Sequence, residues 1–131
     1  MKTGFTLFEL LLVVVIIGII AAAVMPRIAQ QPFKTKVAAA KAFIDTQIAT
    51  ALRFYEMDNG VFPSTDEGLP ALLIKPSSAR NWRGPYLERA PLDPWGNAYG
   101  YRSPGDFRQR DYDLFSLGPD GQESADDIKN W

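Results

Sequence analysis

An unbroken apolar run near the N-terminus constrains this chain more than any other feature of its sequence. Residues 10–25 contain no charged side chain, and the apolar character begins earlier, at Phe5. About 20 consecutive apolar residues are needed to cross a bilayer as an α-helix. The sequence therefore predicts a membrane-spanning helix over residues 5–25, which leaves room for one small domain after it.

A cleaved secretory signal is the main alternative for this run. The apolar core of such a signal is shorter, at about 7–15 residues, and a small-residue cleavage site follows it. Ala21, Ala22 and Ala23 offer such a site, so the alternative stays open on this evidence. A buried helix of a globular core is disfavoured, because the rest of the chain is too short to surround it.

Glu9 is the only charged residue inside the apolar segment. A carboxylate at the centre of a membrane helix costs roughly 2.5–3.5 kcal/mol, and less near the interface. Two interpretations follow from this cost. Glu9 either lies among the lipid headgroups or pairs with a cation inside an assembly.

The residues around Glu9 form a compact pattern. A basic residue, Lys2, precedes Gly4 and Phe5, and the glutamate follows four residues after the phenylalanine. This pattern resembles the leader junction of type IV pilins and pseudopilins. The resemblance implies that a prepilin peptidase cleaves after Gly4, removes residues 1–4 and methylates the new amino group of Phe5. It also implies that Glu9 pairs with the Phe5 ammonium of a neighbouring subunit.

Helical periodicity continues beyond the apolar run. Pro26 removes a backbone donor and predicts a kink. Residues 26–59 are predicted to form an amphipathic continuation of the helix, with apolar residues at helical spacing: Val37, Ala40, Ile44, Ile48, Ala51, Leu52 and Tyr55. Asn59-Gly60 predicts its end, because glycine readily adopts the left-handed conformation that closes helices.

Residues 60–131 read as a small domain of short elements separated by turns. Ser64 and Glu67 have capping-box spacing and predict a short helix that continues through Ile74. Three stretches have the pattern of strands in an antiparallel sheet: Pro85–Leu87, Ala98–Tyr101 and Tyr112–Ser116. The predicted fold class is α+β, with the long N-terminal helix packed on a small antiparallel β-sheet.

The composition excludes several classes of enzyme. The chain contains no cysteine and no histidine, which rules out disulfides, thiolate and histidine metal sites, and Ser-His-Asp hydrolases. A net charge of -1 predicts no general attraction to nucleic acid. Paired carboxylates such as Asp126 and Asp127 act as acid and base, or hold a catalytic metal, in some enzymes. The sequence shows no apolar core that would form a substrate pocket around them. We therefore expect a protein that is not an enzyme.

The acidic C-terminal segment holds the one candidate metal site. Asp120, Asp126 and Asp127 lie in one glycine-containing stretch, and carboxylate oxygens are ligands that calcium prefers. Their spacing is not that of an EF-hand. On the residues alone, a solvated acidic turn is the simpler interpretation, since surface carboxylates are common.

Further stretches narrow the resemblance to the major pseudopilins of bacterial type II secretion systems. They extend the likeness over nearly the whole chain: residues 62–69, 81–87, 93–99, 113–121 and 126–131. The resemblance implies a pilin-like fold with a calcium-binding loop over residues 117–127. The implied ligands are the carboxylates of Asp120, Asp126 and Asp127, with backbone carbonyls from Leu117 and Gln122.

The same resemblance implies a function. The chain would polymerise through its N-terminal helix into a periplasmic filament that drives export of folded proteins across the outer membrane. The implied partners are copies of itself, minor pseudopilins, the prepilin peptidase, the inner-membrane assembly platform and membrane lipid, without nucleic acid. A type IV pilin for adhesion or motility is the alternative, although such pilins usually have a larger, disulfide-closed C-terminal region. A minor pseudopilin at the filament tip is a third possibility.

The resemblance also implies a location. It places the chain in the bacterial inner membrane as a single-pass protein, with the C-terminal domain in the periplasm. The charges alone favour the opposite orientation, because Arg27, Lys34 and Lys36 follow the span and only Lys2 precedes it.

Overall fold

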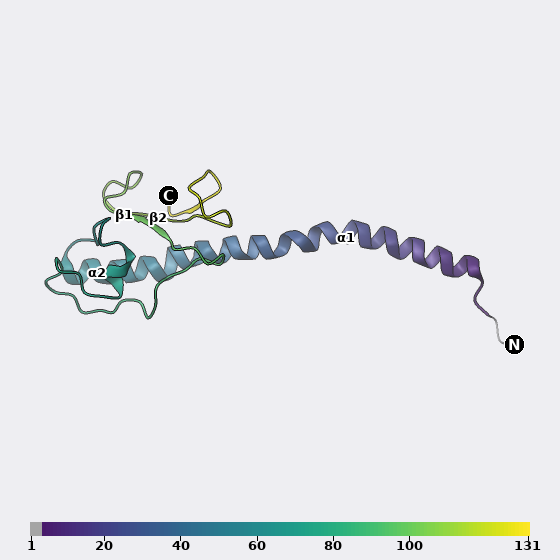
Figure 1. The fold of residues 1–131 in the computed structure, drawn as a ribbon, viewed down its shortest axis with the longest axis horizontal. Helices are drawn as coiled ribbons and strands as arrows, with labels where there is room; N and C mark the ends of the chain where they lie inside the picture. The colour runs from purple at the N-terminus through teal and green to yellow at the C-terminus, as the bar shows by residue number, and fades with distance from the viewer. Residues whose placement is uncertain (1–3) are drawn as a thin grey trace. The chain divides into compact units, whose positions relative to one another are not determined.

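The computed structural model describes the backbone of residues 4–131 and the side chains of residues 4–23 and 32–131. In the described part of the chain the elements are, in order, α1 (Leu7–Ala42), η1 (Phe43–Ile48), α2 (Ala49–Asn59), η2 (Leu69–Leu72), β1 (Gly100–Arg102), β2 (Asp113–Ser116) and β3 (Ile128–Lys129). Figure 1 labels α1, α2, β1 and β2. Two compact units are present, one ending at Thr35 and the other beginning at Lys36, and each is described by itself.

The first unit contains most of α1. Among the described residues, no helix combines the length and the apolar character needed to cross a membrane. The predicted span over residues 5–25 runs into residues 24–31, whose side chains are outside the described part of the chain. The predicted kink at Pro26 also falls outside it. Both therefore stay predictions.

The second unit is built around the amphipathic part of the helix, and the predicted apolar stripe is confirmed. Its members from Ala40 to Tyr55 are buried, and Val37 is partly buried against them. The turn Phe43–Ile48 is π-helical, which the periodicity did not predict. Ile44 and Ile48, four residues apart, are both buried in this turn, so the π-helical segment keeps the apolar face of the helix.

The predicted end of the helix is also confirmed. α2 ends at Asn59, and Gly60 follows with a positive φ of 82°. The Gly60 N–H donates to the Glu56 carbonyl at 2.7 Å, which satisfies one of the last free carbonyls of the helix.

The capping box forms, but the helix predicted through Ile74 is wrong. The Ser64 N–H donates to the Glu67 carboxylate at 2.9 Å, and the Glu67 N–H donates to the Ser64 hydroxyl at 3.3 Å. Gly68 then takes a positive φ of 57°, which interrupts the helical path. Only the short 3-10 helix η2 follows, so the box closes a turn instead of starting an α-helix.

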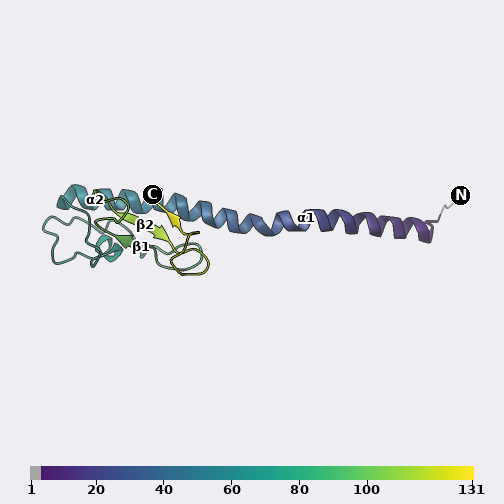
Figure 2. The same cartoon turned by 90° about the horizontal axis from the view of Figure 1, so that it is seen from above.

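The predicted antiparallel sheet is confirmed. β1 pairs with β2 so that Gly100 lies opposite Phe115, and β2 pairs with β3 so that Ser116 lies opposite Ile128. The strand order is β1-β2-β3 (Figure 2). The sheet packs on the helix, because Leu114 and Ile128 share one buried cluster with the apolar stripe.

Two strand predictions need correction. Residues 85–87 form no strand, since the N–H groups of Tyr86 and Leu87 both donate to the Leu72 carbonyl, at 2.7 and 3.4 Å. β1 begins at Gly100 rather than Ala98, which forms only an isolated bridge with Leu92. β3 was not predicted, because two residues are too few to show an alternating pattern.

A buried carboxylate holds the connection between β1 and β2. The Asp113 residue is 0% exposed and accepts the backbone N–H groups of Phe107 at 2.9 Å and Arg108 at 3.0 Å. Gly105 lies against this carboxylate, where a Cβ atom would collide with it. Asp113 therefore organises the loop that precedes its own strand.

The capping box leads to a pH-dependent prediction for Glu67. Hydrogen bonds from the Ser78 hydroxyl and then from Ser64 lower the pKa of Glu67 below its ordinary value of 4.5. A lowered folded-state pKa means that the ionised carboxylate stabilises the fold above about pH 4.5, and that this stabilisation is lost as the pH falls through the lower value. Glu67→Gln should therefore destabilise the chain at pH 7 and much less at pH 3.

Urea unfolding of the chain in detergent micelles at the two pH values measures this effect. Glu88→Gln, at an exposed position, is the matched control. A Glu67→Gln deficit of equal size at both pH values would contradict the prediction.

Candidate functional site

The start of α1 places the residues of the predicted leader junction. Gly4, Phe5 and Thr6 precede the helix, and the Glu9 N–H donates to the Thr6 carbonyl at 3.1 Å and to the Thr6 hydroxyl at 3.3 Å. Thr6 therefore caps the helix, a role that its Thr-x-x-Glu spacing indicates but that we did not predict. Glu9 lies in the first turn, where the helix dipole favours a negative charge.

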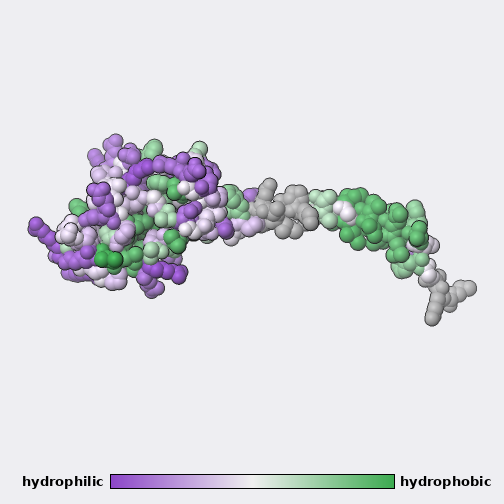
Figure 3. Space-filling model, in the orientation of Figure 1, coloured by the Kyte–Doolittle hydropathy of each residue, from purple (hydrophilic) through white to green (hydrophobic). Residues whose placement is uncertain are grey.

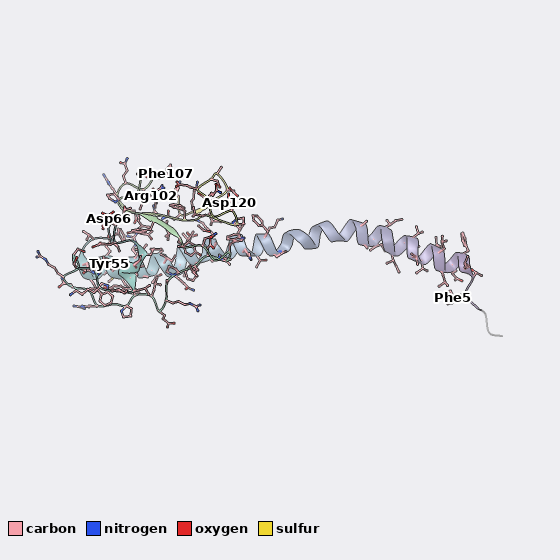
Figure 4. All side chains as sticks on the ribbon, in the orientation of Figure 1. Phe5, Tyr55, Asp66, Arg102, Phe107 and Asp120 are labelled. Atoms are coloured by element: carbon pink, nitrogen blue, oxygen red, sulfur yellow. The ribbon has the colours of Figure 1, made fainter. Side chains whose placement is uncertain are left out.

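The helix after this cap exposes a continuous apolar surface. The exposed fractions of the large apolar residues between Phe5 and Ile20 range from 44% at Val13 to 85% at Leu7. Figure 3 shows this stretch in the green of hydrophobic residues, and Figure 4 labels Phe5 at its start. Exposed apolar surface of this extent marks an interaction site with protein or lipid.

The second candidate site is the segment between β2 and β3. Its first half carries Asp120, labelled in Figure 4, which is exposed and accepts the Gln122 N–H at 3.2 Å. Gly118 and Gly121 have positive φ values of 67° and 65°, a conformation that favours glycine. Leu117 directly follows β2, so the segment 117–122 leaves the sheet and turns within a few residues.

The second half of the segment is organised around Ser124. The Ser124 N–H donates to the Asp127 carboxylate at 3.1 Å, and its hydroxyl donates to the Asp126 carboxylate. That hydroxyl bond lowers the pKa of Asp126. The Asp127 side chain is only 1% exposed, and the Lys129 ammonium lies 3.9 Å from it, at the limit of an ion pair.

The chemistry of these donors fits calcium. Calcium takes hard oxygen ligands, and a nearly buried carboxylate such as Asp127 needs a cation to offset its charge. Asp126 and Asp127 lie together beside Ser124, whereas Asp120 bonds within its own turn. Among the described residues, no group of three or more acidic side chains is arranged to hold a metal ion. The ligand roles of Asp120, Asp126, Asp127, Leu117 and Gln122 therefore stay predictions.

A turn from another part of the chain touches this segment. The Asn97 side-chain amide donates to the Gly118 carbonyl at 2.7 Å, and the Ser116 hydroxyl donates to the Asp93 carboxylate at 2.6 Å. We did not predict these contacts. The composition of residues 93–97 is typical of a turn, so the sequence could have predicted the turn itself. It could not have predicted which distant residues the turn contacts.

Two family models match the chain. The prokaryotic N-terminal methylation motif covers residues 1–25, and the model for type II secretion system protein G covers residues 27–131. The type II secretion system core protein G of Pseudomonas aeruginosa is 46% identical over 138 residues, which span 99% of this chain and 95% of that protein. The core protein G of Vibrio cholerae is 47% identical over 138 residues, which span 99% and 92% of the two chains.

A solved structure is similar as well. The crystal structure of the major pseudopilin from the type 2 secretion system of enterohaemorrhagic Escherichia coli matches with a TM-score of 0.70 and 36% identity, over 77% of this chain and 87% of that one. The helix, the small antiparallel sheet and the methylation motif together define a pilin-like structural protein.

The chain belongs to the type II secretion system protein G family, the major pseudopilins. It is a structural subunit of the type II secretion pseudopilus and not an enzyme, as the sequence resemblance implied.

Proposed function

We propose that copies of this chain polymerise through residues 5–25 into a periplasmic filament, and that its growth drives folded proteins across the outer membrane. The apolar surface between Phe5 and Ile20 is the observation that carries this proposal. That surface is exposed in the single chain, and contact between so large an apolar area and water is unfavourable in free energy. Lipid covers it before assembly, and the same helix of neighbouring copies covers it afterwards.

Before assembly, the chain is a single-pass protein of the bacterial inner membrane with residues 60–131 in the periplasm. The apolar length of residues 5–25 and the methylation motif support this location. Prepilin peptidase removes residues 1–4 by cleavage after Gly4 and methylates the amino group of Phe5. A kink at Pro26 separates the apolar part of the helix from the amphipathic part.

Glu9 and the Phe5 amino group supply the polar contact of the assembly. A carboxylate surrounded by apolar side chains is costly unless a cation neutralises it. After cleavage, the new N-terminus is a cation four residues before Glu9, about one helical turn away along the chain. A neighbouring subunit displaced along the filament axis by a similar distance brings its ammonium level with this carboxylate. The carboxylate of one subunit therefore pairs with the ammonium of a neighbour and sets the axial register between them.

The other partners are minor pseudopilins and the inner-membrane assembly platform, neither of which requires a catalytic group on this chain. Restored export tests the function in cells that lack their own major pseudopilin. Expression of this chain should return secreted proteins to the medium. A chain that is cleaved and inserted in the membrane, yet restores no export, would contradict the proposal.

A structural calcium ion is the second part of the proposal. Asp120, Asp126 and Asp127 hold it with their carboxylates, and Leu117 and Gln122 add backbone carbonyls. The nearly buried Asp127 carboxylate supports a cation here, since a lysine 3.9 Å away is its nearest ionic partner among the described residues. The ion supplies positive charge that allows the three carboxylates to approach one another, and so orders residues 117–127.

Calcium should raise the melting temperature of the chain on the order of 10 °C when it is present at about 100 times its dissociation constant. Thermal melts of the chain in detergent micelles with calcium, magnesium or chelator measure this. The rise should vanish in Asp127→Ala and persist in Asp66→Ala, a change at an exposed aspartate outside the loop. Equal melting temperatures of the unmodified chain in calcium and chelator would show that this loop holds no structural calcium ion.

A further inference from the structure

The turn Asp93–Asn97 is closed by its own hydrogen bonds. One oxygen of the Asp93 carboxylate accepts the N–H groups of Trp95 at 3.0 Å and Asn97 at 2.8 Å, and the Asp93 N–H donates to the Asn97 carbonyl at 2.8 Å. Asp93 is 5% exposed. These bonds hold the turn in one conformation and direct the Asn97 amide toward the segment that follows β2.

The turn fixes both polar backbone groups of Gly118. The second oxygen of Asp93 accepts the Ser116 hydroxyl at 2.6 Å, and that hydroxyl accepts the Gly118 N–H at 3.1 Å. The Asn97 amide donates to the Gly118 carbonyl at 2.7 Å. Gly121 also lies close to the same side chain, since a Cβ atom there would be 3.5 Å from the Asn97 oxygen.

Gly118 lies between Leu117 and Asp120, two of the proposed calcium ligands. With both backbone groups of Gly118 held, less of the loop has to become ordered when the ion binds. Ser124 separately organises the other half of the loop through Asp126 and Asp127. A loop ordered in advance loses less conformational entropy on binding, and this raises affinity.

We infer that the Asp93–Asn97 turn positions the 117–127 loop for calcium, with Asn97 as a positioning residue that does not touch the ion. This inference rests on the proposed calcium site. Residues that orient metal ligands from outside the coordination shell typically change metal affinity by about 10–100-fold. Asn97→Ala should therefore weaken calcium binding by at least about 10-fold.

Isothermal titration of the full chain with calcium, in detergent micelles, measures this change. Asn81→Ala is the matched control, because Asn81 is exposed and lies in another part of the sequence. We expect the control to bind calcium like the unmodified chain, and both variants to keep nearly its melting temperature in chelator. A general loss of stability would lower that melting temperature, which separates it from a positioning effect.

The outcomes distinguish the two proposals. If the unmodified chain binds no calcium, both the calcium site and this inference are wrong. If it binds calcium and Asn97→Ala binds equally well, only the inference is wrong. Hydrogen exchange on the unmodified chain in chelator gives a second test that needs no variant: the Gly118 amide should be protected without calcium, and free exchange there would overturn the inference.

Discussion

Replacing Glu9 by alanine is expected to abolish filaments while leaving the chain in the membrane. The change removes one partner of each proposed pair and leaves the Phe5 ammonium of the neighbour unpaired among apolar helices. An unpaired buried charge costs about 3–5 kcal/mol, and a loss of about 3 kcal/mol reduces an association constant by roughly 100-fold. Electron microscopy and immunoblotting of sheared filaments, compared with the membrane fraction, measure the assembled share of the chain.

Thr6→Ala is the matched control for this experiment. It removes the hydroxyl that accepts the Glu9 N–H at 3.3 Å but leaves both proposed charges in place. We expect this variant to assemble, because loss of an N-cap costs only about 1 kcal/mol. Normal filaments from Glu9→Ala would mean that the carboxylate has no part in assembly and belongs to the headgroup region instead.

Asp113→Ala is expected to lower the free energy of unfolding of the second unit by about 3 kcal/mol, since a hydrogen bond to a charged group contributes about 1.5–3 kcal/mol. The carboxylate accepts two backbone N–H groups, from Phe107 and Arg108, and Asp113 is fully buried. Alanine would leave both donors without this acceptor. Urea denaturation of the chain in micelles measures the loss.

Asp106→Ala is the control for Asp113→Ala. Asp106 lies in the same loop but is exposed, and the Arg102 guanidinium lies 3.7 Å from its carboxylate. Exposed pairs of this kind contribute about 0–1 kcal/mol. Equal stabilities for the two variants would show that the loop does not depend on the buried carboxylate.

Local patterns in the sequence predicted much of this fold. The stripe from Ala40 to Tyr55 and the helix end at Gly60 depend on neighbours within one or two helical turns, and both are confirmed. The Ser64 and Glu67 capping bonds are local for the same reason. The helix expected after them failed because Gly68 takes a positive φ, which spacing alone does not reveal.

Contacts between distant residues could not be predicted in this way. Asn97 and Gly118 are 21 positions apart, and Asp93 and Ser116 are 23 apart, so no periodic pattern connects them. β3 consists of two residues and owes its existence to its pairing with β2. The same holds for the candidate site. Residue types indicated the carboxylates of the 117–127 loop, but only the structure shows that the Asp93–Asn97 turn contacts the start of that loop.

Electron cryomicroscopy of filaments assembled from this chain measures the assembly contact most directly. We expect residues 5–25 to form a helical core, with the Glu9 carboxylate of each subunit within hydrogen-bonding distance of a neighbour's Phe5 amine. Filaments held together by residues 36–131 alone, with the apolar helices outside the core, would contradict assembly through the N-terminal helix.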